Sequence, residues 1–113
     1  MLPVNDSVRE MQMAYYADLS PLELDQPLEL CFEQSLKVSK SMGWKPIASE
    51  SNSWFEAYEE TALFGFKDDI RVELRSIEKG CRIDVRSVSR LGVSDLGVNA
   101  KRIQSFYDAL KAM

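Results

Sequence analysis

The stretch IRVELRSIEKGCRIDVRS, residues 70–87, decides the fold of this chain. Apolar and polar residues alternate on both sides of a Glu-Lys-Gly turn, which is the pattern of two half-buried strands in a β-hairpin. A two-residue loop at Lys79 and Gly80 would place opposite charges together on one face and apolar side chains together on the other. The predicted facing pairs are Arg75–Asp84, Glu73–Arg86, Leu74–Val85, Val72–Ser87 and Ser76–Ile83.

Helical periodicity is found on either side of the hairpin. From Pro27 to Gly43, apolar residues recur at helical spacing, with Asp25 as the candidate cap and Gly43 as the terminator. A second helix is predicted over residues 100–112, with Asn99 as its cap. Its apolar stripe consists of Ile103, Phe106, Tyr107 and Leu110.

Shorter segments complete the predicted fold. Residues 44–49 predict a strand, 54–66 predict one bent strand or two, and 66–69 predict a turn. Residues 20–27 predict an extended connector, because each of two prolines disfavours helix in the residue before it. The fold class is therefore α+β: an antiparallel sheet of three to five strands with two main helices packed on one face, in the order helix, strands, helix.

The expected domain organisation is simple. A chain of 113 residues that is 45% hydrophobic fits one modest core. We expect a single α+β domain over 25–113, preceded by an N-terminal extension over 1–24 that is able to form one short helix near residues 6–15. No apolar run reaches the roughly 20 residues that a membrane-spanning helix needs, so the chain is expected to be soluble.

Composition excludes several functional classes. The chain has no histidine, which removes Ser-His-Asp and Cys-His catalysis and zinc bound by histidine. A pI near 4.8 argues against general nucleic-acid binding. We predict no cofactor, no metal site and no catalytic residue. Cys31 and Cys81 are expected to be buried packing residues, and a disulfide between them is the alternative.

The segment from Asp84 to Arg102 concentrates polar residues between the last strand and the last helix. One interpretation is structural: arginines would clamp aspartates and brace a tight loop. The other is an anion site at the start of the last helix, because Lys101 and Arg102 would there oppose the helix dipole. The candidate residues are Arg86, Ser87, Ser89, Arg90, Ser94, Asp95, Asn99, Lys101 and Arg102, with Asp68 and Asp69 as acidic partners, and most of them are expected to converge.

Four motifs resemble a family that bears only a number, domain-of-unknown-function family 1499, found in bacteria and plastids. They are FGFKDD at 64–69, DVRSVSRLGVSDLGVN at 84–99, AKRI at 100–103 and QMAYYADLSPL at 12–22, the last with Ala17 where the family has proline. The resemblance implies no assigned activity. Because longer relatives carry secretory or membrane segments upstream, it implies the soluble part of an envelope or periplasmic protein.

The sequence thus leaves two classes of function open. The favoured class is a non-catalytic binding or interaction module, with a protein partner or a small anionic ligand. The alternative is a small-molecule or small-anion binding domain, or an enzyme, that uses the Arg86–Arg102 cluster.

Overall fold

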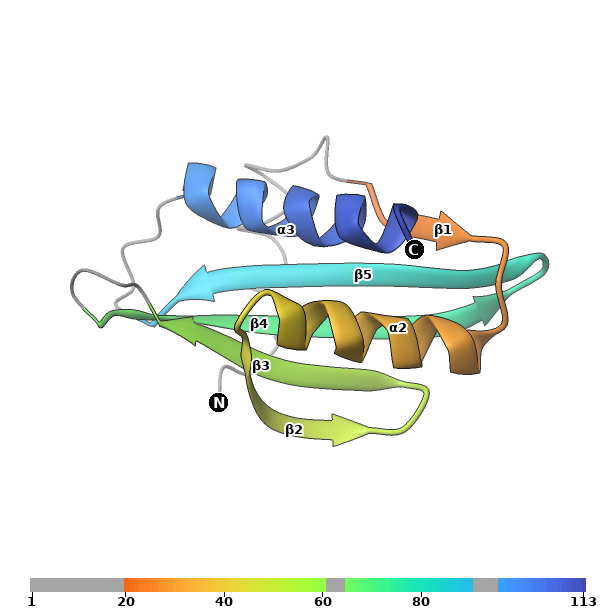
Figure 1. The fold of residues 1–113 in the computed structure, drawn as a ribbon, viewed down its shortest axis with the longest axis horizontal. Helices are drawn as coiled ribbons and strands as arrows, with labels where there is room; N and C mark the ends of the chain where they lie inside the picture. Colours follow the sequence, from red (N-terminus) through yellow and green to blue (C-terminus); the bar gives the residue numbers. More distant parts are fainter. Residues whose placement is uncertain (1–19, 61–64, 91–95) are drawn as a thin grey trace.

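The computed structural model describes residues 20–60, 65–90 and 96–113. Five strands form one antiparallel sheet in the order β1-β5-β4-β3-β2, together with two helices (Figure 1). The α+β class is confirmed, although one strand precedes the first helix. The helix predicted near residues 6–15 lies outside the described residues. The elements are β1 (Leu22–Leu24), α2 (Leu28–Ser41), β2 (Lys45–Glu50), β3 (Trp54–Glu60), β4 (Lys67–Ile77), β5 (Gly80–Ser89) and α3 (Leu96–Lys111).

The helices and the central strands enclose the core. α2 contacts α3, β4 and β5, and α3 also contacts β5. In Figure 1 α3 runs alongside β5, and α2 crosses in front of β4. Phe106 of α3 is fully buried and stacks on Trp44 with ring centroids 5.0 Å apart. The strands contribute the alternating apolar residues Ile70, Val72, Leu74, Ile83 and Val85.

The hairpin is present, but the predicted register is wrong by two residues. Arg75 faces Arg82 rather than Asp84, and the loop consists of Glu78 and Lys79. A shift of two residues keeps every side chain on its predicted face, because the side-chain period of a strand is two. Glu73 still forms the predicted ion pair with Arg86, now as a diagonal neighbour.

Gly80 explains why the hairpin has the observed register and not the predicted one. It closes the hairpin opposite Ile77 with φ +147°, in the positive range that favours glycine. A Cβ at this position would overlap the carbonyl oxygen of Leu24 at the end of β1. The register is therefore tied to the docking of β1 along β5, which places Leu24 opposite Cys81.

We expect Gly80→Ala to lower the free energy of unfolding by about 1–3 kcal/mol, the usual range for strained backbone, with the overlap at Leu24 adding to it. Gly43→Ala is the matched control. Gly43 also has a positive φ, +79°, but nothing lies within 4 Å of its Cβ position. Urea unfolding should show the larger loss for Gly80→Ala, and equal losses would contradict the role given to Leu24.

Two segments without a predicted strand belong to the sheet. Lys67 to Asp69, predicted as a turn, begin β4, and both aspartates are buried. Part of the predicted connector forms β1 and pairs with β5. The sequence predicted a turn here because aspartate is disfavoured in strands. In the structure, arginines that are distant in sequence pair with the two carboxylates and allow the strand to form.

Both helices begin at residues other than those predicted. The N-cap of α2 is Pro27 rather than Asp25, without a side-chain cap. α2 ends at Ser41, and Gly43 terminates it as predicted. The Gly43 N–H donates to the Lys40 carbonyl and the Trp44 N–H donates to the Ser39 carbonyl, which together form a Schellman motif. α3 begins at Leu96, so Asn99 lies inside the helix and is not its cap.

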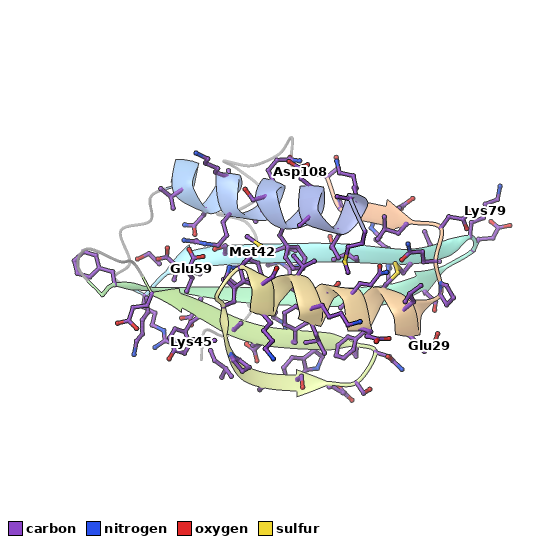
Figure 2. All side chains as sticks on the ribbon, in the orientation of Figure 1. Glu29, Met42, Lys45, Glu59, Lys79 and Asp108 are labelled. Carbon is purple, nitrogen blue, oxygen red and sulfur yellow. A yellow bond between two sulfur atoms is a disulfide. The ribbon has the colours of Figure 1, made fainter. Side chains whose placement is uncertain are left out.

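Cys31 and Cys81 form a disulfide, drawn in yellow in Figure 2. The expectation that they are only packing residues is wrong, and the alternative is correct. Both are fully buried, as expected of packing residues. The bond joins the first turn of α2 to the start of β5, and so links the first helix to the hairpin.

Tyr107 provides a test of the core by pH. Its hydroxyl donates to the Ile83 carbonyl at 3.2 Å, and burial raises the pKa of Tyr107 to about 12. A raised pKa means that the folded state favours the neutral phenol. This stabilisation is complete below about pH 10 and is lost as the pH rises towards 12.

We therefore expect the wild-type stability to fall over this window by up to about 1.4 kcal/mol per pH unit from Tyr107 alone. Tyr107→Phe should lose about 1 kcal/mol at neutral pH and show a flatter alkaline decline. Urea unfolding across the window measures both. An equally steep decline in the variant would contradict the assignment.

Candidate functional site

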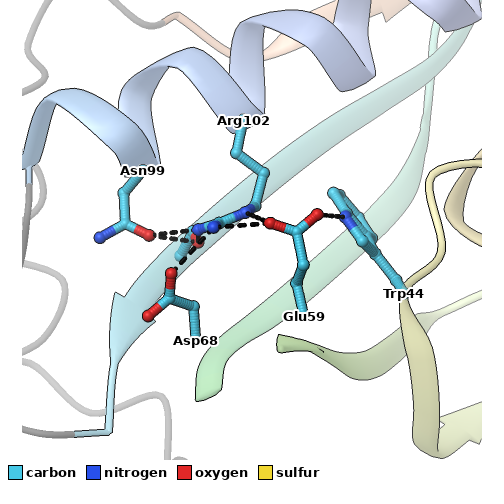
Figure 3. Close-up of polar contacts among 6 residues, drawn as sticks. Trp44, Glu59, Asp68, Asn99 and Arg102 are labelled. Carbon is cyan, nitrogen blue, oxygen red and sulfur yellow. Dashed lines mark hydrogen bonds and ion pairs between the residues drawn. The ribbon is translucent and has the colours of Figure 1, made fainter. Parts of the chain in front are cut away.

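Arg102 of α3 is the centre of a buried polar cluster, which we call the Arg102 cluster (Figure 3). Its side chain is 5% exposed, and every nitrogen of the guanidinium has a protein acceptor. Nε donates to Glu59 at 2.9 Å, and Nη2 donates to Asp68 at 2.8 Å. Nη1 donates to Ser87 Oγ at 2.9 Å and to Asn99 Oδ1 at 2.6 Å.

Strand alternation and register assemble the cluster. Glu59 of β3 faces Asp68 of β4, which in turn faces Ser89 of β5. Ser87 precedes Ser89 by two residues on β5, so the two side chains lie on the same face of the sheet. Asn99 and Arg102 are three residues apart on α3, so their side chains lie on one side of the helix. The end of β3, the start of β4, the end of β5 and one turn of α3 thus meet at one cation.

The polar contacts continue beyond the guanidinium. The Ser87 hydroxyl donates to Asn99 Oδ1 at 2.7 Å while accepting from Arg102. The indole Nε1 of Trp44 donates to the second carboxylate oxygen of Glu59 at 3.2 Å. One cation is thus shared by two carboxylates, of which Glu59 is the more exposed. Such an arrangement holds β3, β4, β5 and α3 together.

A second group of predicted residues lies on the opposite face of the sheet. Arg90 forms a bidentate pair with Asp69, with both contacts at 2.8 Å. Arg86 pairs with Glu73, the partner predicted from the hairpin, and so does not clamp an aspartate as the structural interpretation of the segment expected. Asp68 and Asp69 are adjacent on a strand and must point to opposite faces. The predicted convergence into one cluster is therefore wrong, because these residues divide into two groups.

Of the remaining candidates, the structure describes Ser89 and Lys101. Ser89 is half-buried on the same face as Ser87, whereas Lys101 is exposed. Ser94 and Asp95 lie outside the described residues. Because α3 begins at Leu96, Lys101 and Arg102 lie beyond its first turn. The dipole argument for an anion site there is wrong, since that effect fades within the first turn.

Sequence reasoning missed Glu59 and Trp44. Phe55 and Ala57 point to the same face of β3 and are buried, and Phe55 packs against Phe32 of α2. A glutamate at the next position of that face would need a partner. The signal was therefore a charged residue at an inward position near the end of an alternating strand.

The outer face of the sheet carries stacked cations and aromatic rings. The Arg71 guanidinium lies 4.5 Å from the ring centroid of Trp54 and 3.3 Å from the Glu56 carboxylate. Lys67 and Arg90 each lie 5.2 Å from the ring centroid of Tyr58. Arg71, Lys67 and Arg90 thus each lie against a carboxylate or a ring of the same face, as is typical of a stabilised sheet surface.

A pocket of about 480 Å³ lies between the second half of α2 and β2. Its base is apolar, and Lys40 stands at its edge. None of the candidate residues that the structure describes lines it. The lining residues are Leu36, Ser39, Lys40, Trp44, Pro46, Ile47, Ala48, Ser49, Phe55, Glu56 and Ala57.

These features define a small α+β domain with a buried arginine cluster, one internal disulfide and an open pocket at the edge of its sheet. The chain belongs to the family described as "Protein of unknown function (DUF1499)", whose family model matches residues 3–110. No curated protein matches the chain. Across the described residues, neither helix has the length and apolar character that crossing a membrane would require.

Proposed function

We propose that this chain is a non-catalytic binding module in which the Arg102 cluster is architectural and the α2–β2 pocket receives the ligand. One observation carries the proposal. Arg102, the most buried of the candidate cations, has every guanidinium nitrogen bonded to acceptors of this chain. An anionic ligand would have to displace Glu59 or Asp68, so the cluster is better suited to holding the fold than to binding.

The pocket has the properties of a ligand site. Small-molecule sites are concave, mostly apolar and of about 300–1,000 Å³, and this pocket falls within that range. In this proposal the two helices cover one face of the sheet as far as β4. The apolar surface over β3 and β2 then remains open, with Leu36 and Ile47 exposed at its edge.

We further propose that the domain functions in an oxidising compartment such as the cell envelope. The disulfide between Cys31 and Cys81 supports this, because such bonds are rare in the reducing cytosol. The same compartment is implied by the family's longer relatives.

A thermal-shift screen tests the proposed site. Compounds with an apolar body should raise the melting temperature of the wild type by roughly 10 °C at 100 times their dissociation constant. Ile47→Asp should abolish the shift, and Leu30→Asp is the matched control, because Leu30 is similarly exposed but does not line the pocket.

Two outcomes would contradict the proposal. One is a screen of anions, nucleotides, divalent cations and apolar compounds that produces no shift. The other is a shift by inorganic anions that survives Ile47→Asp and disappears in Lys101→Gln, which would return the site to the start of α3.

A further inference from the structure

The geometry points to a small amphipathic carboxylate as the ligand of the α2–β2 pocket, with its apolar body on Phe55 and Ala57 and its carboxylate at Lys40. This inference rests on the proposed function and names the ligand class of the same site. No residue of the Arg102 cluster takes part in it.

The base of the pocket is apolar and preformed. Trp44, Phe55 and Ala57 line it and are themselves almost fully buried in the core. Leu36 and Ile47 stand at its edge and are 40% and 38% exposed. A ligand with an apolar body would cover both side chains, and removing this apolar surface from water would favour binding.

The charges around the pocket favour an anion. Lys40 lines the pocket and takes part in no ion pair among the described residues, whereas its neighbour Lys37 pairs with Glu33. The acid that lines the pocket, Glu56, is paired with Arg71 at 3.3 Å. Lys40 is thus the cation left for a ligand carboxylate.

The end of α2 has an opposing effect, because a helix C-terminus carries partial negative charge. Here the Schellman motif reduces it: the carbonyls of Ser39 and Lys40 accept bonds from Trp44 and Gly43. The long side chain of Lys40 can also hold its ammonium group away from the backbone. The attraction to Lys40 therefore exceeds the residual repulsion.

The edge strand argues against a peptide as the occupant. Each residue of the edge strand β2 is exposed, but the strand contains Pro46, a bulge between Pro46 and Ala48, and charged residues at both ends. These features protect sheet edges from pairing with another strand. Leu36 and Ile47, the two large exposed apolar side chains of the pocket, are also too few for a folded partner, which needs about 800 Å² on each side.

Trp44 provides a direct reading of occupancy. The chain contains two tryptophans, and only Trp44 lines the pocket, while Trp54 stacks with Arg71 on the outer face. Trp54→Phe therefore leaves Trp44 as the one tryptophan, and excitation at a wavelength that tyrosine does not absorb reports on the pocket alone. Four probes separate the features of the ligand: octanoate, 1-octanol, octylammonium and acetate.

We expect octanoate to change the Trp44 emission with a saturable curve, octanol to bind about threefold to fivefold more weakly, and octylammonium and acetate to bind more weakly still. Lys40→Gln should weaken octanoate by the same factor, as expected for an exposed ion pair, and should leave octanol unchanged. Lys37→Gln is the matched control and should change neither. Ile47→Asp should weaken both by more than tenfold.

Equal binding of octanoate, octanol and octylammonium, abolished by Ile47→Asp, would overturn the carboxylate inference and leave the pocket as the binding site. Octanoate binding that is unchanged in both Lys40→Gln and Ile47→Asp would overturn it by placing the ligand elsewhere. Absence of binding by all probes would also overturn it, and the thermal-shift screen then decides the proposed function separately.

Discussion

Replacing Arg102 with alanine is expected to lower the free energy of unfolding by about 3–5 kcal/mol, the range for breaking a buried ion pair. The loss arises because the buried partners of Arg102 would be left without their cation. The Asp68 side chain is only 9% exposed and would keep a charge without its cation, and Asn99 and Ser87 would lose a shared donor. Urea unfolding without added ligand measures the change.

Lys101→Ala is the matched control, because Lys101 is adjacent in sequence but exposed. Its effect should stay within about 0.5 kcal/mol. A cycle with Asp68→Ala and the double variant isolates the pair, and the double variant should be less destabilised than the sum of the two single changes. A loss below about 1 kcal/mol for Arg102→Ala would show that the cluster is not architectural.

Removing the disulfide should have an effect of similar size. Cys31 and Cys81 are separated by 50 residues, and closing a loop of that length in the unfolded chain stabilises the fold by about 4 kcal/mol in the chain-entropy account. The double variant Cys31→Ala, Cys81→Ala should therefore unfold at a clearly lower urea concentration than the wild type.

Reduction provides the second measurement. A reductant should lower the stability of the wild type by a comparable amount and leave the double variant unchanged. Thiol titration of the unreduced, unfolded protein should find neither cysteine reactive. Two reactive thiols, or a wild-type stability that does not respond to reductant, would show that the bond does not form and would remove the argument for an oxidising compartment.

Several features could be predicted from the sequence because they depend on local periodicity. Alternation over residues 70–87 assigned each hairpin side chain to its correct face, and helical spacing located both helices. Gly43 terminates α2 as predicted, because the turn after the helix needs a left-handed backbone conformation, which glycine adopts at low cost. Arginines of the polar segment were expected to pair with aspartates, because a buried charge needs a partner. Arg102 pairs with Asp68, and Arg90 pairs with Asp69.

Other features depended on partners that are distant in sequence. The two possible hairpin registers differ by two residues and share the same faces, so periodicity could not separate them. The close approach of Leu24 to Gly80 distinguishes the observed register. Asp68 and Asp69 have the sequence pattern of a turn. They lie in a strand because Arg102 of α3 and Arg90, which follows β5, form ion pairs with them.

The sequence by itself determined the α+β class, the inward and outward faces of the hairpin and the presence of both helices, because these follow from periods of two and 3.6 residues along the chain. The tertiary structure alone decided the register, the pairing of Cys31 with Cys81, the division of the arginines between two faces and the pocket beside β2. Each of these depends on which distant segments come into contact, and local pattern does not contain that information.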